Sequence, residues 1–110
     1  MKKAGWEEMR LALIDLEREL QALDLWSVQP PTSTQMASSQ PFCVDTMAFA
    51  QWLQWIFIPR MHSLAGQRLP LPGNCQIKPM GEQSLLYLGR RQNDLLRALA
   101  RVDRLATDLA

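Results

Sequence analysis

The chain of 110 residues has room for one domain, and its composition, 47% hydrophobic and 21% charged, is that of a folded globular protein rather than a disordered one. A formal net charge of +1 gives no overall attraction to nucleic acid or to a membrane. No apolar run approaches the roughly 20 residues that cross a bilayer, and residues 1–8 lack the apolar stretch of a secretion signal, so we expect a cytoplasmic protein without membrane contact.

The first predicted element is an amphipathic helix over residues 4–25. Its apolar side chains recur at spacings of three and four residues: Trp6, Met9, Leu13, Leu16, Leu20 and Leu23. Charged side chains occupy the other faces, so one face should pack on a core while the rest meets water. Pro30 and Pro31 end this helical pattern, and residues 30–40, rich in Ser, Thr, Gln and Pro, are expected to form a surface connection.

A second helix is predicted to begin near Pro41 or Asp45. Proline suits the first turn of a helix, and a carboxylate there can accept hydrogen bonds from free backbone N–H groups. Residues 47–58 are apolar on nearly every face, with Gln51 and Gln54 as the polar exceptions. Such a segment is typical of a helix surrounded by others, so we expect it to be the central and most buried helix of the fold.

Pro59 interrupts this apolar helix, because proline has no N–H to donate to the carbonyl four residues earlier. The helix should kink there or restart as a shorter one through about Ala65, with Gly66 marking its end. Residues 69–74, with the sequence Leu-Pro-Leu-Pro-Gly-Asn, are typical of a turn.

Helical spacing returns after Pro79, in a set of apolar residues that comprises Leu85, Leu88, Leu95, Leu99, Val102 and Leu105. Residues 89–91 are the expected interruption, which divides this region into a short third helix and a long fourth. We therefore predict an all-α fold: one domain over residues 1–110, built as a compact four-helix bundle with a central apolar helix and Pro-rich connecting loops.

Residues 41–61, Pro-Phe-Cys-Val-Asp-Thr-Met-Ala-Phe-Ala-Gln-Trp-Leu-Gln-Trp-Ile-Phe-Ile-Pro-Arg-Met, resemble the signature block of the YqcC-like family, small bacterial proteins that carry a domain of unknown function. Residues 69–73 followed by 77–80 resemble the next landmark of the family, and residues 25–26 an earlier one. The resemblance implies a four-helix bundle. Members tend to be encoded beside a tRNA pseudouridine synthase, so it also implies an accessory role in tRNA modification. It supplies no catalytic motif and no cofactor.

The residues themselves carry no pattern typical of catalysis or metal binding. His62 is the one histidine and has no local partner that would mark a catalytic triad, so we expect an ordinary, partly exposed histidine. Cys43 and Cys75 belong to no CxxC pair and have no neighbouring histidine, so both are expected to be reduced thiols. We therefore expect no enzyme, no cofactor and no metal site.

Several side chains of the signature block have two readings. Asp45 is either a helix cap or a contact for a ligand or partner. Arg60 needs an acceptor, which is either an internal group, such as Asp45 or carbonyls at a helix end, or a phosphate or carboxylate of a partner. Trp52 and Trp55 either pack in the core or leave an apolar face exposed, to which a partner or a second copy of the chain could bind.

The fourth helix carries arginines on one side, at spacings of 7, 4 and 3 residues: Arg90, Arg97, Arg101 and Arg104. This stripe could follow an RNA backbone, which would give weak contact with tRNA. The alternative is a solvated face, or one that pairs with the first helix, because residues 1–24 hold six acidic and four basic side chains.

The function we predict is that of a non-enzymatic interaction protein, with a tRNA pseudouridine synthase as its partner. The candidate contact residues are Asp45, Gln51, Trp55, Pro59 and Arg60, and the arginine stripe is a secondary, RNA-facing candidate. A homodimer remains open. The alternative function is small-molecule binding in an apolar pocket lined by Trp52, Trp55 and Phe49.

Overall fold

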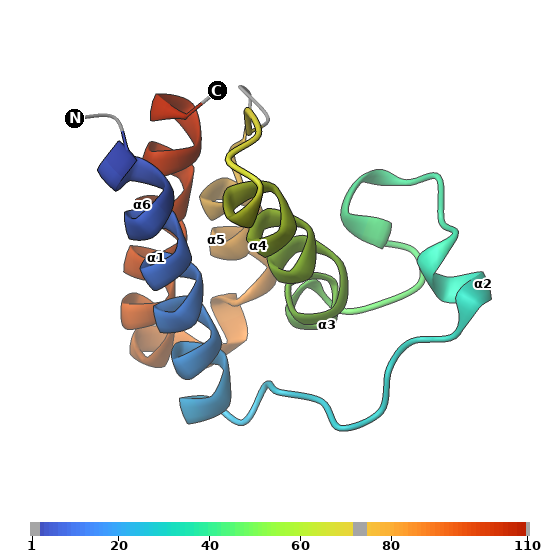
Figure 1. Ribbon diagram of the computed structural model, residues 1–110. Helices are drawn as coiled ribbons and strands as arrows, with labels where there is room; N and C mark the ends of the chain where they lie inside the picture. Colours follow the sequence, from blue (N-terminus) through green and yellow to red (C-terminus); the bar gives the residue numbers. More distant parts are fainter. Residues whose placement is uncertain (1–2, 72–74, 110) are drawn as a thin grey trace.

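The computed structural model describes residues 3–71 and 75–109, which form helices and no strand. The predicted four-helix bundle is confirmed (Figure 1). Its members are α1 (Lys3–Ala22), a helix composed of α3 (Phe49–Trp52), η2 (Leu53–Phe57) and α4 (Ile58–Gly66), then α5 (Lys78–Ser84) and α6 (Asn93–Asp108). The short elements α2 (Ser33–Met36), η1 (Pro41–Cys43) and η3 (Leu86–Gln92) lie in the connections. None of the helices in residues 3–71 and 75–109 has the length and apolar character to span a bilayer.

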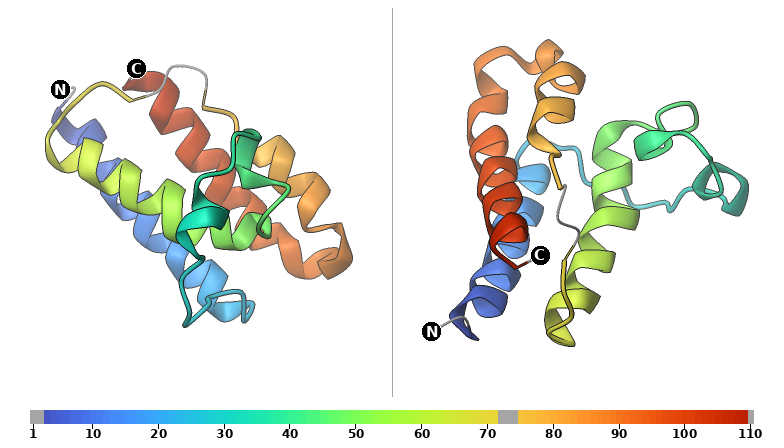
Figure 2. Two further views of the ribbon diagram at one scale, coloured as in Figure 1. Left: turned by 90° about the vertical axis from the view of Figure 1, so that its right-hand side faces the viewer. Right: turned by 90° about the horizontal axis from the view of Figure 1, so that it is seen from above.

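The centre of the bundle is the pair α1 and α6, which lie side by side, with α4 against the other flank of α1 (Figures 1 and 2). These two helices supply most of the fully buried large side chains: Met9, Leu13, Leu16 and Leu20 from α1, and Leu95, Leu99 and Val102 from α6. Residues 47–58 were expected to be the most buried segment. They do supply Leu53 to the core, but Trp52 and Trp55 are only half-buried, so that part of the expectation is wrong.

The helix at the N-terminus ends at Ala22, three residues before the predicted end. Asp24 has a left-handed backbone (φ 63°), and the N–H of Leu25 donates to the carbonyl of Leu20 at 2.9 Å. The same closure follows α4, where Arg68 is left-handed (φ 55°). Each helix therefore ends in the turn that normally favours glycine at the left-handed position, although neither residue is glycine.

The second helix begins later than predicted. Pro41 starts only the 3₁₀ turn η1, in which Phe42 and Cys43 have left-handed φ values of 59° and 50°. Residues in that conformation cannot continue a right-handed helix, so α3 starts anew at Phe49. The side chain of Gln51 caps the new start, because its Oε1 accepts the N–H of Ala48 at 3.1 Å.

Pro59 neither breaks nor restarts the helix. One wide π turn, η2, precedes it, and the N–H of Ile58 donates to the carbonyl of Leu53, five residues earlier. The wider turn lies where the proline ring would otherwise collide with the carbonyl of Trp55. The ribbon consequently runs without a break from α3 through α4 (Figure 2).

Residues 26–48 leave the bundle as a long excursion that carries α2 and η1 (Figure 1). Thr32 and Gln35 form a reciprocal capping box around α2, a short helix that the sequence reading treated as loop. The buried side chain of Gln54 fixes the start of the excursion. Its Oε1 accepts the N–H of Ser27 at 2.8 Å, and its Nε2 donates to the carbonyl of Ser27 at 2.7 Å.

The short third helix and long fourth helix are confirmed, and the expected interruption is present: Gly89 (φ 58°, ψ −134°) breaks the helical backbone within η3, which joins α5 to α6. An acid from α6 caps α5, since the carboxylate of Asp103 accepts the N–H groups of Ile77 and Lys78, each at 2.9 Å. Of the predicted turn at 69–74, the first residues form an extended link with Leu71 buried. Residues 72–74 lie outside the described residues.

Candidate functional site

The structure separates the five contact residues predicted from the sequence. Asp45 is exposed on the excursion and accepts a hydrogen bond from the hydroxyl of Ser38, so it neither caps a helix nor pairs with Arg60. Arg60 and Pro59 are exposed on the outer face of α4, where the guanidinium needs no internal acceptor. The expected internal partner for Arg60 is therefore wrong.

The other two candidates, Gln51 and Trp55, also lie apart. Gln51 borders a cavity on one flank of α3, whereas Arg60 borders a different cavity on the other flank. Trp55 is half-buried and borders neither of them, and its indole Nε1 is enclosed without a hydrogen-bond partner among the described residues. Residues of the signature block (41–61) therefore lie at two separate surfaces of the molecule.

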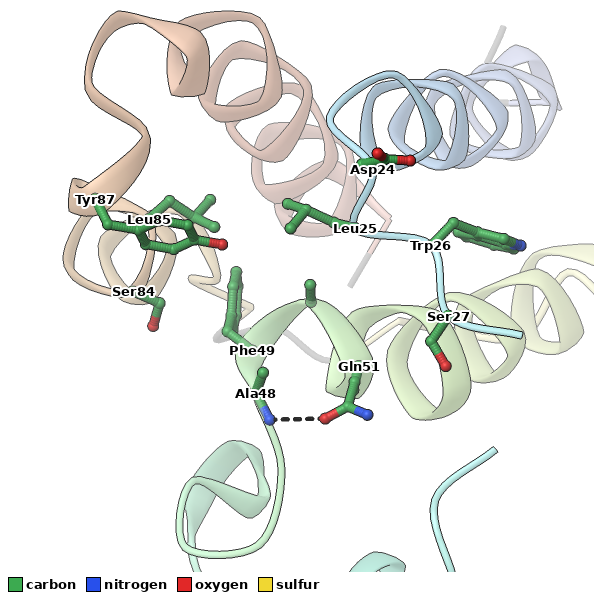
Figure 3. A pocket seen from close by; sticks show the side chains of 11 residues that line it. Asp24, Leu25, Trp26, Ser27, Ala48, Phe49, Gln51, Ser84, Leu85 and Tyr87 are labelled. Carbon is green, nitrogen blue, oxygen red and sulfur yellow. Dashed lines mark hydrogen bonds between the residues drawn. The ribbon is translucent and has the colours of Figure 1, made fainter. Parts of the chain in front are cut away.

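The first cavity, of about 260 Å³, lies where the end of α1, the start of α3 and the corner between α5 and η3 meet (Figure 3). Leu25, Phe49 and Leu85 point toward one another across it, and Tyr87 covers one side, while the ring of Trp26 is directed away (Figure 3). The walls come from three separate segments of the chain, so only the folded bundle presents this cavity.

Two large apolar side chains stand out beside the first cavity. Leu86 is 68% exposed and Tyr87 is 71% exposed, both at the corner that leads into η3. Tyrosine is enriched among residues that dominate protein interfaces, because its rigid ring buries much area at a small entropic cost. We call Leu86, Tyr87 and the bordering Leu25 and Phe49 the corner patch.

The second cavity, of about 210 Å³, is lined by an aromatic cluster. The ring of Trp52 lies 5.2 Å from that of Phe57 in a stacked arrangement and 4.8 Å from that of Phe42, edge to face. Arg60 stands at the same cavity, and Cys75 and Ile77 line its other side. The predicted pocket with Trp52, Trp55 and Phe49 is thus corrected: of the three residues, only Trp52 lines this cavity.

Cys75 connects the second cavity to the helix cap behind it. Its thiol donates to Oδ1 of Asp103 at 3.4 Å. Burial, together with the neighbouring carboxylate of Asp103, raises the pKa of the Cys75 thiol to about 12. The thiol is therefore protonated at neutral pH, and both cysteines are buried and free, as expected for reduced thiols.

The arginines of the fourth helix do not form an uninterrupted basic stripe. Arg97 pairs with Asp94 on the same helix, and Nη1 of Arg101 lies 2.9 Å from Oδ2 of Asp15 on α1. The groove between α1 and α6 is lined by three acidic and three basic side chains. Arg104 is exposed on α6, whereas Arg90 is exposed on η3, so its predicted place on the fourth helix is wrong. The arrangement matches the reading in which this face pairs with the acidic first helix.

His62 is half-buried, and its Nε2 lies 3.1 Å from Oε2 of Glu17 on α1, so it joins α4 to α1. In the part of the chain that the structure describes, no three histidine, cysteine or acidic side chains are grouped so that they could hold a metal ion. Two arrangements of side chains stand out among the described residues: the corner patch and the small aromatic cavity.

Sequence reasoning missed the corner patch, although a signal was present. Residues 85–88, Leu-Leu-Tyr-Leu, are four consecutive apolar residues, and a helix or turn can bury only about half of such a run on one side. Leu85 is buried and Leu88 partly so, which turns the middle pair outward. The role of Phe42 left no such signal, since its place depends on an unusual backbone conformation.

Comparison with known proteins gives relatives over nearly the whole chain. Residues 8–105 match a protein family, DUF446, that is described as tRNA pseudouridine synthase C. The protein YqcC of Escherichia coli is 37% identical over 102 residues, which cover 93% of this chain and 94% of YqcC. The solution NMR structure of YqcC superimposes with a TM-score of 0.85 and covers 96% of this chain and 91% of that one.

One relative is a much longer protein. A tRNA pseudouridine synthase C of Pectobacterium carotovorum is 45% identical to this chain over 65 residues, which are 59% of this chain but only 17% of that protein. The chain thus corresponds to a small part of the length of that synthase, whereas it matches YqcC nearly end to end.

Proposed function

We propose a function for this chain as a member of the DUF446 family, to which it belongs and which is described as tRNA pseudouridine synthase C. The resemblance to YqcC-like proteins is confirmed. The chain acts as a non-enzymatic accessory protein that binds a tRNA pseudouridine synthase and supports its work on tRNA. It contributes no catalytic group of its own to the reaction.

One observation carries this proposal. A sequence closely related to this chain occurs within a protein named tRNA pseudouridine synthase C, and a full-length relative, YqcC, occurs as a separate small protein. A domain that exists both joined to an enzyme and on its own is expected to act beside that enzyme in either form.

The corner patch is the surface that we assign to the synthase. Leu86 and Tyr87 expose more than two thirds of their area, and Leu25 and Phe49 extend the apolar surface into the adjoining cavity. Gln51, one of the contacts predicted from the sequence, lies at the border of the same cavity. Tyrosine is enriched near the centre of protein interfaces, where it fills a pocket of the partner or borders one of its own.

The experiment is affinity purification of the tagged chain from its native host, combined with quantification of pseudouridine in tRNA after deletion of the gene. We expect the synthase to accompany the wild-type chain and tRNA pseudouridine to fall in the deletion strain. If no synthase is recovered and pseudouridine is unchanged, the proposal is wrong.

A second step tests the surface. We expect Tyr87→Ala to weaken binding of the synthase by about tenfold or more, the effect of a residue at the centre of an interface. Val44→Ala is the control, because Val44 is an exposed apolar residue (55%) on the excursion and neither it nor its direct neighbours line the first cavity. If both variants bind the synthase equally well, the interface does not include the corner patch. Sedimentation of the isolated chain shows whether the patch instead joins two copies.

A further inference from the structure

We propose that the second cavity, the one between α3, α4 and the segment before α5, is a binding site for a small aromatic anion: one ring bearing a single carboxylate or similar charge. The proposal does not depend on the synthase, because the cavity and the corner patch share no residue. It is carried by the size, walls and charge of the cavity.

The size of the cavity limits the ligand. Its volume of about 210 Å³ exceeds the roughly 150 Å³ that accepts a benzene molecule in an apolar protein cavity, and falls below the roughly 300 Å³ of a typical drug-sized site. One ring with a short substituent fits this space, whereas a dinucleotide or a lipid chain does not.

The walls favour an aromatic body. Phe42, Trp52 and Phe57 form one side, and Ile77 and Met61 complete a lining that is mostly apolar. The Trp52 ring already stacks on two others, with 5.2 Å between ring centroids to Phe57 and 6.0 Å to Phe49. The edges of these rings remain, and a ring edge carries partial positive charge that attracts the face of a second ring.

The charge of the site favours an anion. Among the described residues that line the cavity, Arg60 is the one with an ionised side chain, and no ion pair or hydrogen bond joins its guanidinium to another described residue. Cys75 is protonated and therefore adds no negative charge to the wall. Asp103 accepts its hydrogen bonds from the thiol and from two backbone N–H groups behind the wall. A guanidinium beside an apolar cavity binds a carboxylate or phosphate by charge-assisted hydrogen bonds.

The backbone holds the cavity in shape. Phe42 and the following Cys43 both adopt left-handed φ values, which are strained in residues other than glycine. This conformation sets the Phe42 ring edge to face against Trp52 and thereby forms one wall. Strained residues of this kind persist where the surroundings hold them, and they are frequent at ligand sites.

The test is a titration of the full chain with phenylacetate and with phenylacetamide, a neutral molecule of nearly the same shape. The readout is the NMR signal of the Trp52 indole N–H, with the dissociation constant taken from its shift. We expect phenylacetate to bind in the millimolar range or better, about fivefold more tightly than the amide, the effect of one partly exposed charge pair.

Two arginine variants test whether Arg60 causes the preference for the charged ligand over the neutral one. Arg60→Gln should abolish the preference for the anion while phenylacetamide still binds, whereas Arg104→Gln, a control at another exposed arginine, should leave the preference intact. The proposal is overturned if phenylacetate at about 10 mM leaves the Trp52 signal unmoved. It is also overturned if acid and amide bind equally to the wild-type chain, or if both variants show the same preference between them.

Discussion

Gly81 lies at the crossing of α5 and α6, and its replacement by alanine tests how closely these helices must approach. A Cβ atom at this position would lie 2.6 Å from Cδ1 of Leu99 and 3.4 Å from a ring carbon of Phe49. Leu99 is fully buried, so its side chain has little room to withdraw. Forcing an extra methyl group into a packed core costs about 1–3 kcal/mol, against a gain of about 1 kcal/mol from the better helix propensity of alanine.

The expected result for Gly81→Ala is a net loss of about 1 kcal/mol in the free energy of unfolding, measured by urea denaturation with helical circular dichroism. The thermal midpoint should fall by about 4 °C or more. Gly66→Ala is the control: no atom lies within 4 Å of a Cβ there, so it should keep or slightly raise stability.

A second change separates crowding from other effects of the alanine. If Leu99 is the obstacle, Leu99→Val should cost less in the Gly81→Ala background than in the wild-type chain, because it removes the atom group that the new methyl meets. Should Gly81→Ala prove as stable as Gly66→Ala, the close approach of α5 and α6 described above would be refuted.

Three further predictions concern stability and pH. Asp24→Gly and Arg68→Gly should each raise the free energy of unfolding by about 1 kcal/mol in urea titrations, because both positions are left-handed, and Asp24→Ala should lower it. The pKa of the Cys75 thiol is raised from 9.0 to about 12, so the thiol stays protonated in the folded chain but ionises in the unfolded chain above pH 9. Stability should therefore decline from pH 9 toward 12, by about 2 kcal/mol at pH 10.5 relative to Cys75→Ala in paired urea titrations; equal pH profiles would contradict this. Asp103→Asn should speed alkylation of Cys75 by iodoacetamide, as followed by mass spectrometry, since it removes the carboxylate charge and one of the two oxygens that accept the N–H groups at the start of α5.

Local periodicity was enough to predict the long helices of the bundle. The apolar spacing in α1 and α6 is a property of each segment, and the buried residues follow it closely. The break at Gly89 could also be predicted, since glycine is the residue that accepts the backbone found there.

Features that depend on distant partners or on unusual backbone could not be predicted. The left-handed Phe42 delays α3 until Phe49, and a phenylalanine carries no sign of that conformation. The role of Asp103 depends on such a distant partner, because it caps a helix that begins 25 residues earlier. The setting of Arg60 likewise depends on tertiary packing: the side chain is exposed beside a cavity that three segments of the chain create together.

The wide turn before Pro59 explains how one continuous helix, from α3 through α4, can keep the same face toward the core. The inward side chains recur at every fourth position: Phe49, Leu53, Phe57, Met61 and Ala65. Each α-helical residue advances by about 100°, so this series would drift by about 160° around a regular helix. The π turn absorbs about one residue and cuts the drift to about 60°. It therefore corresponds to an inserted residue, and a one-residue deletion at 53–57 would restore a regular helix while leaving everything downstream in phase.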